Sequence, residues 1–239
     1  MDKVGIIIPA YNEEKNVEKL IKQIQKCLHK PYIVLVDDSD NYKTSEIIKN
    51  KKIKVQYFHR KIKSGRGSAV LFGLQKMIKN KNITAFVEMD ADFSHKPSEL
   101  KRNLKHFYGK NSDLLIASRY LTKSKIVNWP IPRRILSILS NKLAKFLLRI
   151  PVTDYTNGYR IYSKRAVSII TKKCGRIGDG FIVLSEIITM IYLKKYKIDE
   201  IHTIFINRVR GESSVSLKLF LQSLIGLFKI FLIKIFRKI

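Results

Sequence analysis

Short apolar runs and amphipathic stretches alternate along the first 120 residues of the chain. Each apolar run has the length of a buried β-strand and ends at proline or at polar residues. The runs span residues 3–9, 32–38, 53–58, 83–90 and 113–118. Between them, apolar positions recur at helical spacing within residues 12–30, opened by Asn12 as N-cap, and within 44–50, 67–80 and 95–107. Strands separated by helices predict an α/β fold, with a mainly parallel central sheet and helices on both faces.

The pattern changes after Tyr120, where two long stretches combine apolar and basic residues. Arg133–Ile150 is typical of an amphipathic helix, with leucine, isoleucine and phenylalanine on one face and basic residues on another. Ser216–Ile239 is apolar on most sides of a helix, but lysines interrupt it before the ~20 uninterrupted apolar residues of a spanning helix accumulate. We therefore expect both segments to lie in a membrane interface. A single C-terminal span is the alternative for the second segment.

The composition indicates a folded and strongly basic protein. With 239 residues, 45% of them hydrophobic, the chain can bury a sizeable core, which excludes the disordered class. Its two cysteines cannot form a disulfide framework, which favours a reducing cytoplasm, and its N-terminus does not resemble a secretory signal peptide. The net charge of +28 suits a nucleic acid or an anionic membrane. Eight basic residues and no acid lie within 119–149, beside apolar stretches, and this placement favours the membrane.

Polar residues gather where the predicted strands end. Pro9–Glu13, Asp37–Asp38, Asp90–Asp92 and Arg119 each follow a strand, and Gly65–Ala69 opens a helix. Ligands of parallel sheets bind at the carboxyl ends of the strands, so we expect these residues to meet at one edge. Asp90 and Asp92 stand two positions apart, which points both carboxylates the same way. Neighbouring carboxylates stay ionised when a cation lies beside them, and Mg²⁺ or Mn²⁺ suits carboxylates and phosphates.

Seven motifs occur in the order in which family 2 glycosyltransferases carry them. They are IIIPAYNEEKNV, IVLVDDSDN, GRGSAVLFGL, VEMDADFSHKP, IASRY, TDYTNGYRIYSK and NRVRGESS. The chain resembles this family from Val4 to about Ser214, and the motifs are most similar to those of the dolichol-phosphate mannose synthases. DADFSHKP, TDYTNGYR and RVRGES are the motifs more specific to the polyprenyl-phosphate branch of the family. The resemblance implies a GT-A fold and a metal-dependent, inverting transfer of a sugar from a nucleotide donor to a polyprenyl or dolichyl phosphate. GDP-mannose is the favoured donor, and UDP-glucose is the main alternative.

The resemblance also assigns residues to the expected site. Nucleotide-sugar positions are matched by Pro9, Tyr11, Glu13, Val36, Asp38, Asp90, Ala91 and Asp92. The metal would be held by Asp90, Asp92 and Ser94, the last of which stands where related enzymes carry glutamine. The lipid phosphate or donor phosphates would be met by Arg119, Arg133, Ser137 and Arg208, with Arg210 supplying the charge of a family lysine that is Ser214 in this chain. Asp92 and Arg119 are the candidate catalytic residues.

We expect one glycosyltransferase domain over residues 1–212, with a nucleotide-sugar and metal half at 1–120 and an acceptor half at 121–212 that contains the interface helix 133–150. Residues 213–239 would form a C-terminal membrane-associated helix. The expected partners are a nucleotide sugar, a polyprenyl or dolichyl phosphate and the cytoplasmic face of the cell membrane, where the protein would be peripheral. We expect no nucleic acid partner, and the pattern leaves the oligomeric state open.

Alternative interpretations exist for the charge and for several residues. A nucleic-acid-binding protein would suit the charge, but no helix-turn-helix, zinc or RNA-recognition signature occurs in the sequence. A soluble enzyme of the same fold with a non-lipid acceptor is opposed by the two basic amphipathic segments. The residue-level alternatives are a structural role for His95, an internal Asp154–Arg160 ion pair, a paired core acid at Glu186, solvated charges at Arg133 and Arg134, and an ordinary helix start at Gly65–Ala69.

Overall fold

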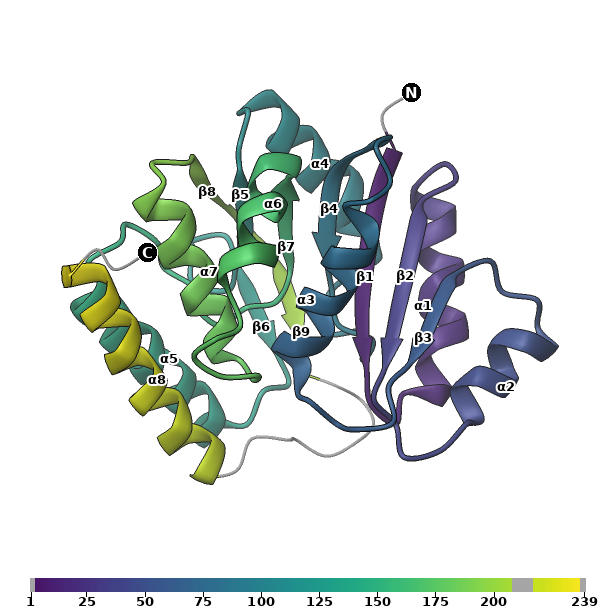
Figure 1. The fold of residues 1–239 in the computed structure, drawn as a ribbon, viewed down its shortest axis with the longest axis horizontal. Coiled ribbons are helices and arrows are strands. Elements are labelled where there is room, and N and C mark those ends of the chain that lie inside the picture. Colours follow the sequence, from purple (N-terminus) through teal and green to yellow (C-terminus); the bar gives the residue numbers. More distant parts are fainter. Residues whose placement is uncertain (1–2, 208–216, 237–239) are drawn as a thin grey trace.

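The fold is built around a central sheet of seven strands, shown in Figure 1. The structure is a computed structural model that describes residues 3–207 and 217–236. Across the sheet the strands lie in the order β3 (Gln56–His59), β2 (Tyr32–Asp37), β1 (Lys3–Ala10), β4 (Ile83–Glu88), β7 (Arg160–Ser163), β5 (Leu114–Ser118) and β8 (Ile198–His202). A second sheet consists of the parallel strands β6 (Lys125–Val127) and β9 (Ile204–Ile206).

All strands of the central sheet run in one direction except β7, which is antiparallel to both β4 and β5. The predicted mainly parallel α/β sheet is therefore confirmed. β7 is not among the predicted strands, because its four residues are too few for a periodic pattern and a basic residue opens it. Its position between β4 and β5 brings part of the chain after residue 120 back into the middle of the sheet.

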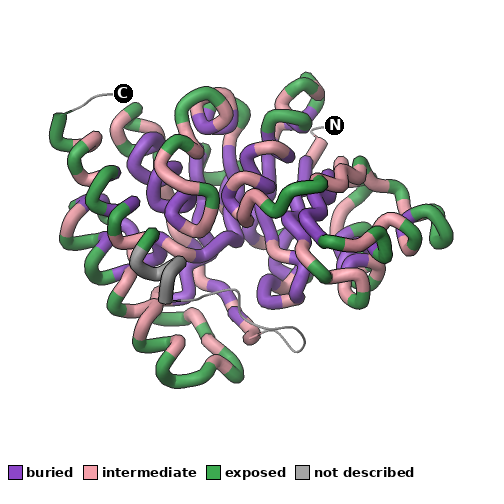
Figure 2. The backbone as a smooth tube through the Cα atoms, turned by 60° about the horizontal axis from the view of Figure 1, so that its bottom comes forward, coloured by how far each residue is buried: buried purple, intermediate pink, exposed green. Residues whose placement is uncertain are grey.

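Helices cover both faces of the sheet (Figure 1). One face carries α1 (Glu14–Cys27), α2 (Lys43–Asn50) and α4 (Leu100–Gly109), which follows a 3-10 turn at Pro97–Glu99. The other carries α3 (Arg66–Met77), α6 (Lys164–Lys173) and α7 (Ile182–Leu193). Successive residues of β1 serve opposite cores, since Ile7 packs with α3 whereas Ile6 and Ile8 pack with α1. Figure 2 shows the buried residues concentrated in the middle of the molecule.

The turn after β1 differs from its prediction. Asn12 is not the N-cap of α1, which begins at Glu14 with Glu13 in the cap position and no side-chain cap bond. Asn12 has a φ of 56°, in the left-handed region that asparagine tolerates better than most residues. Its N–H donates to Ser39 Oγ over 2.8 Å. The turn thus links the ends of β1 and β2, where the predicted site lies.

Two helices, α5 (Ile131–Leu148) and α8 (Leu217–Phe236), lie against each other beside α7. On α8, Leu227 and Ile230 belong to the core, whereas Ile225, Phe228, Leu232, Ile235 and Phe236 are exposed. Lys234 Nζ donates to the carbonyl of Leu148 at the end of α5. Within residues 3–207 and 217–236, no helix has both the length and the apolar character needed to cross a bilayer.

α5 shows the same division between a core face and a solvent face. It begins at Ile131, two residues before the predicted start, with a proline in its first turn. Ala144 and Leu148 are buried, whereas Ile131, Ile135, Leu139, Leu143 and Phe146 are exposed. The exposed faces of α5 and α8 therefore both carry large apolar side chains.

Candidate active site

A cavity of about 940 Å³ opens at the carboxyl ends of β1, β2 and β4. The predicted residues that line it are Pro9, Tyr11, Glu13, Asp38, Asp90, Ala91 and Asp92. Val36 does not line the cavity, because its side chain is fully buried in the core. Residues 177–182 and part of α8 also line it, although neither segment is among the predicted site residues. The predicted residues therefore meet at one edge of the sheet. Residues 177–182 and α8, from the second half of the chain, complete the wall of the cavity.

At the β1–β2 side of this cavity, polar side chains are held by specific contacts. Tyr11 Oη donates to Asp40 Oδ2 over 2.7 Å, and Lys63 Nζ lies 3.5 Å from the centre of the Tyr11 ring. Asp38 binds Arg60 through both carboxylate oxygens, each over 2.6 Å. Asp38 is thus part of an ion pair, and Arg60 fixes the orientation of its carboxylate.

The acids at the end of β4 are held by an arginine that is not among the predicted site residues. Arg66, the first residue of α3, donates from Nη1 to Glu88 Oε1 over 2.6 Å and from Nε to Asp90 Oδ1 over 2.8 Å. Glu88 is inaccessible to solvent and also accepts a 2.5 Å bond from Tyr162 Oη. Burial disfavours the charge of Arg66, but Asp90 and Glu88 outweigh this effect and raise its pKa. A buried carboxylate that stays charged needs a counter-charge, so Glu88 within an apolar strand was the signal for a buried cation in the sequence.

Asp92 lies in the wall of the cavity with an exposure of 8%. Its Oδ1 accepts the backbone N–H of Ser94 over 3.0 Å and also the Ser94 hydroxyl. Ser94, the third predicted ligand, therefore directs its hydroxyl toward Asp92. No group of three or more His, Cys, Asp or Glu is placed to hold an ion among the residues that the structure describes. The pair Asp90 and Asp92 fits Mg²⁺ or Mn²⁺, which take one or two carboxylates and complete their shell with phosphate and water oxygens.

His95 connects the acidic loop to the segment before β7. Its Nδ1 accepts the backbone N–H of Asp90 over 3.1 Å, and its Nε2 lies 3.0 Å from Asn157 Oδ1. The ring proton is assigned to Nε2, because Nδ1 must be bare to accept. Asn157 donates in turn to the carbonyl of Ala117 in β5 over 2.5 Å. These bonds join the ends of β4 and β5 and support the structural interpretation of His95.

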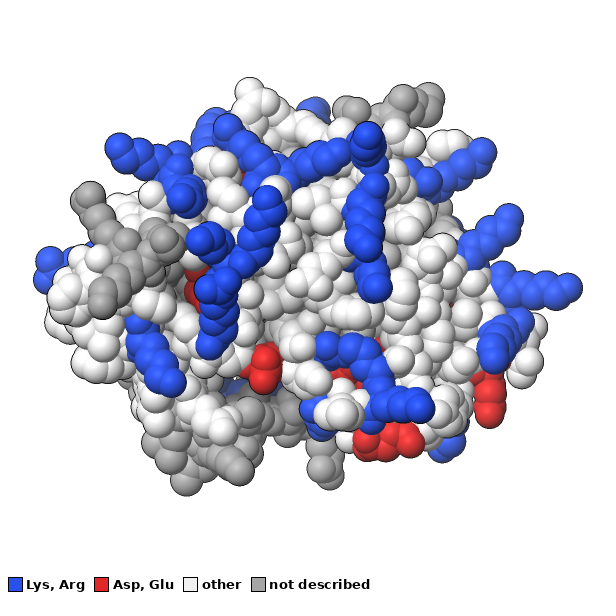
Figure 3. Space-filling model, in the orientation of Figure 1, with Lys and Arg blue, Asp and Glu red and all other residues white. Residues whose placement is uncertain are grey.

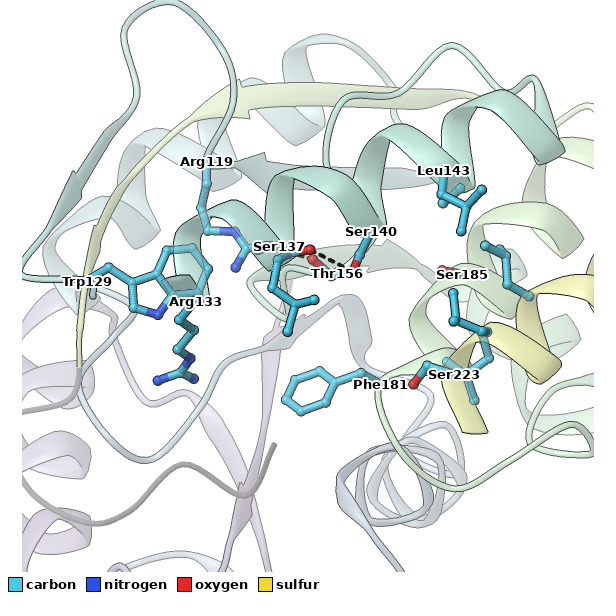
Figure 4. Close-up of a pocket in the computed structure, with 15 residues that line it drawn as sticks. Arg119, Trp129, Arg133, Ser137, Ser140, Leu143, Thr156, Phe181, Ser185 and Ser223 are labelled. Atoms are coloured by element: carbon cyan, nitrogen blue, oxygen red, sulfur yellow. Dashed lines mark hydrogen bonds between the residues drawn. The ribbon is translucent and has the colours of Figure 1, made fainter. Parts of the chain in front are cut away.

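A smaller cavity of about 170 Å³ lies between α5, α7 and α8, shown in Figure 4. Its apolar lining includes Leu136, Leu143, Ala144, Leu224 and Leu227. In Figure 4, Arg119, Arg133 and Trp129 lie toward one end of it, and Leu143, Ser185 and Ser223 lie toward the other. Three predicted acceptor residues, Arg119, Arg133 and Ser137, therefore line one cavity. Phe181, Ile182 and Ser223 line both cavities, so the two are direct neighbours.

Arg119 is fixed by a buried carboxylate. Asp154 accepts from its Nε over 2.8 Å, from its Nη2 over 2.7 Å and from its backbone N–H over 2.9 Å. Burial disfavours both charged forms, but the mutual attraction outweighs it, lowering the pKa of Asp154 and raising that of Arg119. The alternative in which Asp154 pairs with Arg160 is wrong, because Arg160 donates to the carbonyls of Tyr155, Asn157 and Leu184.

The remaining predicted acceptor residues have different settings. Arg133 donates from Nη1 to Asn207 Oδ1 over 3.3 Å, and its guanidinium carbon lies 5.5 Å from the centre of the Trp129 ring. The Ser137 hydroxyl lies 2.6 Å from the Tyr120 hydroxyl. Arg134, by contrast, is exposed and lines neither of the two cavities. Arg208 and Arg210 lie outside the described residues.

Comparison with known proteins gives a consistent result. The family described as Glycosyl transferase family 2 matches residues 5–170. The chain is 34% identical over 69% of its length to a polyprenol monophosphomannose synthase of Mycolicibacterium smegmatis. It is 31% identical over 90% of its length to an undecaprenyl-phosphate mannosyltransferase of Micrococcus luteus, and 32% identical over 95% to a dolichol-phosphate mannosyltransferase of Pyrococcus furiosus. The matches span 63%, 88% and 63% of these relatives' own lengths, respectively.

Among solved structures, the chain is similar to glucosyl-3-phosphoglycerate synthase from Mycobacterium tuberculosis in complex with Mn²⁺, UDP and glucosyl-3-phosphoglycerate. The TM-score is 0.67 at 15% sequence identity, covering 98% of this chain and 80% of the other. A complex of the same enzyme with UDP alone gives a TM-score of 0.66 at 14% identity, covering 96% of this chain and 80% of the other. At this identity the likeness concerns the fold, and it confirms the expected GT-A type of α/β fold.

Proposed function

The chain belongs to glycosyl transferase family 2, and from this premise we propose that it transfers mannose from GDP-mannose to a polyprenyl phosphate at a membrane. The observation that carries the proposal is the junction of two unlike cavities at Phe181. One is lined by several charged side chains and contains the acidic loop after β4, as a nucleotide sugar requires. The other is apolar and carries arginines, as a lipid phosphate requires. The three relatives named above act on polyprenol or dolichol phosphates, which supports the same acceptor class.

The acceptor supplies its own nucleophile. The second pKa of a phosphate monoester is about 6, so the acceptor is mostly a dianion at neutral pH and needs no general base. One phosphate oxygen forms a bond to the anomeric carbon of the donor. The bond from that carbon to the diphosphate oxygen breaks, and its electron pair leaves with the nucleoside diphosphate. Attack opposite the leaving group inverts the anomeric centre, so the protein contributes positioning and charge stabilisation.

Arg119 and Arg133 are proposed to bind the acceptor phosphate. A planar guanidinium binds phosphate oxygens in pairs, and the Asp154 bonds keep Arg119 in one orientation. Ser137 lies one helical turn beyond Arg133 on α5, on the same side, where its hydroxyl can add a bond. Arg208 and Arg210 are proposed to add phosphate contacts, as their place in the RVRGES motif implies.

The donor is proposed to occupy the larger cavity. Pro9, Tyr11, Glu13 and Asp38 would contact the nucleoside, and the loop Asp90–Asp92 would face the diphosphate. Asp90 and Asp92 would hold Mg²⁺ or Mn²⁺, with Ser94 orienting Asp92 through its two hydrogen bonds. When bound, the ion supplies positive charge that stabilises the leaving diphosphate.

The exposed faces of α5 and α8 are proposed to rest on the cytoplasmic face of the membrane. Phe146, Phe228 and Phe236 are among their exposed apolar side chains, and lysines accompany them on both helices. Burial of the apolar residues and attraction of the basic ones to anionic lipid act together. Arg133 lies in the first turn of α5, so a lipid phosphate could reach it from the membrane surface.

The test is a transfer assay with purified protein, undecaprenyl phosphate in vesicles containing anionic lipid, and radiolabelled GDP-mannose, UDP-glucose and UDP-galactose. We expect label in the lipid fraction from GDP-mannose, dependent on Mg²⁺ or Mn²⁺. Transfer from UDP-glucose alone would replace the donor and keep the acceptor. Lack of transfer from every donor, or full activity in excess EDTA, would contradict the proposed reaction or its metal dependence. Asp92→Asn serves as the inactive control, because it keeps the shape of the side chain and removes its charge.

A further inference from the structure

Arg66 occupies a site built for its guanidinium beneath the acidic loop. Nη1 binds Glu88 over 2.6 Å, and both Nε and Nη2 approach Asp90 Oδ1, over 2.8 and 2.7 Å. Glu88 is inaccessible to solvent, and the Arg66 side chain is only 14% exposed. The guanidinium therefore forms a buried bridge between a core carboxylate and the first acid of the loop.

Several neighbouring residues accommodate or contact the Arg66 guanidinium. A Cβ at Gly158 would overlap Nη2 of Arg66, so the absence of a side chain there accommodates the guanidinium. The ring of Phe181, which lines both cavities, lies 5.6 Å from the guanidinium carbon. Tyr162 donates to the second oxygen of Glu88 and completes the network. Arg66 is thus oriented from several sides, which is unlike a mobile surface cation.

The charge of Arg66 bears directly on cation binding by the loop. A divalent ion at Asp90 and Asp92 would lie close to a fixed positive charge, which repels it. Oδ1 of Asp90 is also engaged by two nitrogens of Arg66, which reduces what that oxygen can offer to an ion. A donor diphosphate would offset the repulsion between Arg66 and the ion, because it adds negative charge at the loop.

We infer that Arg66 is a positioning residue that holds Asp90 and weakens the loop's intrinsic affinity for a divalent cation, so that the ion binds mainly together with the donor diphosphate. This inference rests on the proposed function for the identity of the diphosphate and of the ion. What it adds is that Arg66 weakens metal binding, and this effect can be measured without any transfer reaction.

The decisive variant is Arg66→Leu/Glu88→Leu, which removes both charges and leaves neither partner buried alone. Mn²⁺ binding to the protein without nucleotide is followed by electron paramagnetic resonance, with circular dichroism and thermal melting as checks of folding. We expect an affinity about fivefold or more above that of the wild type, because the positive charge that is removed is in contact with Asp90 and its loss outweighs the loss of the Glu88 charge. With GDP present, the difference should shrink. Asp92→Asn added to the double variant should abolish the gain.

A second variant, Glu88→Gln, keeps the packing. It is expected to change the Mn²⁺ affinity in the opposite direction. The amide oxygen can accept from Arg66 while the amide NH₂ donates to the Tyr162 hydroxyl, so the network can persist. Arg66 then has only Asp90 as a counter-charge, and Mn²⁺ affinity without nucleotide should fall by a few fold. The matched control is Arg165→Leu/Asp113→Leu, which removes an ion pair at the amino end of β5, at the opposite edge of the sheet from the acidic loop. It should leave Mn²⁺ affinity without nucleotide unchanged.

Each outcome decides the inference. An increase for Arg66→Leu/Glu88→Leu together with a decrease for Glu88→Gln supports it. Affinities equal to or below that of the wild type for the double variant overturn it while leaving the metal site standing. If neither the wild type nor any of the variants binds Mn²⁺, even with GDP present, both the inference and the proposed metal site are overturned. Failure of mannose transfer alongside the expected shifts would contradict only the proposed function.

Discussion

Asp154 is the residue on which the position of Arg119 depends. It is fully buried and accepts three hydrogen bonds from Arg119. Asp154→Asn would leave a buried guanidinium without its counter-charge, which typically costs about 3–5 kcal/mol. We expect a matching drop in the free energy of unfolding, measured by urea denaturation, and a loss of transfer. Adding Arg119→Leu should recover part of the stability but none of the activity. A single Asp154→Asn variant of wild-type stability would show that the pair contributes little.

Arg133 and Arg134 are adjacent residues with different surroundings, which makes them a matched pair. Arg133 lines the smaller cavity beside Trp129, whereas Arg134 is exposed and lines neither of the two cavities described above. Arg133→Lys should raise the KM for the lipid acceptor about tenfold, because the planar fork is lost while the charge remains. Arg134→Lys should change it little. Steady-state kinetics with varied undecaprenyl phosphate decides, and equal effects of both substitutions would place the phosphate elsewhere.

At the scale of elements, Glu186 makes the stability of α7 depend on pH. Burial raises its pKa above the ordinary value of 4.5, although Gly175 N–H donates to it over 2.8 Å and the charge of Arg176 acts in the opposite direction. The folded state therefore holds this proton more tightly than the unfolded state. The contribution of Glu186 to the free energy of unfolding is therefore greatest at low pH. It is lost as the pH rises from 4.5 through the raised pKa of the folded state.

Glu186→Gln should accordingly stabilise the protein at pH 7 to 8, by about 1.4 kcal/mol for each unit by which the pKa is displaced. The gain should shrink as pH falls through 4.5, because well below that value the wild-type carboxyl is protonated in both states. Urea unfolding at several pH values measures it, with Glu46→Gln on the exposed face of α2 as the control. A gain independent of pH would point to packing instead of charge.

The two faces of α8 are expected to serve different purposes, and two neighbouring residues separate them. Leu227 is buried in the core, whereas Phe228 is 54% exposed. Leu227→Ala should cost about 2–5 kcal/mol of folding free energy, as core truncations do. Phe228→Ala should leave stability nearly unchanged but weaken flotation with anionic vesicles, more visibly at high salt where the basic residues are screened. Wild-type vesicle binding by Phe228→Ala would argue that another surface meets the membrane.

At the scale of the whole molecule, charge is unevenly distributed. Figure 3 shows basic side chains over much of one face, with the few visible acids mostly along its lower edge. That edge corresponds to the carboxyl ends of β1 and β2 in the same orientation. A chain of net charge +28 therefore keeps several of its acids near the expected donor site, where some of them pair with arginines.

Much of this arrangement could be predicted from local patterns. Strands and helices alternate regularly within residues 3–118. The carboxyl ends of the strands carry predicted residues that meet in the larger cavity. The rest depends on tertiary contacts between distant segments. Residues 177–182, the inner face of α8 and Arg66 join the site only because α3, α7 and α8 pack together. Asn12 was predicted to be an N-cap and is not, because its left-handed backbone conformation places it in the turn before α1.

The place of β7 in the sheet has a consequence for synthesis of the chain. β7 lies between β4 and β5 but follows both in the sequence. While a ribosome is still making residues 160–163, the facing edges of β4 and β5 have no native neighbour, and open strand edges invite association with other chains. We expect a fragment of residues 1–150 to aggregate and to lack a cooperative urea transition, unlike the full chain. A monomeric, cooperatively unfolding fragment would contradict this. The nascent protein thus passes through a period in which its sheet is incomplete, and we expect the two proposed functional halves to fold as one unit.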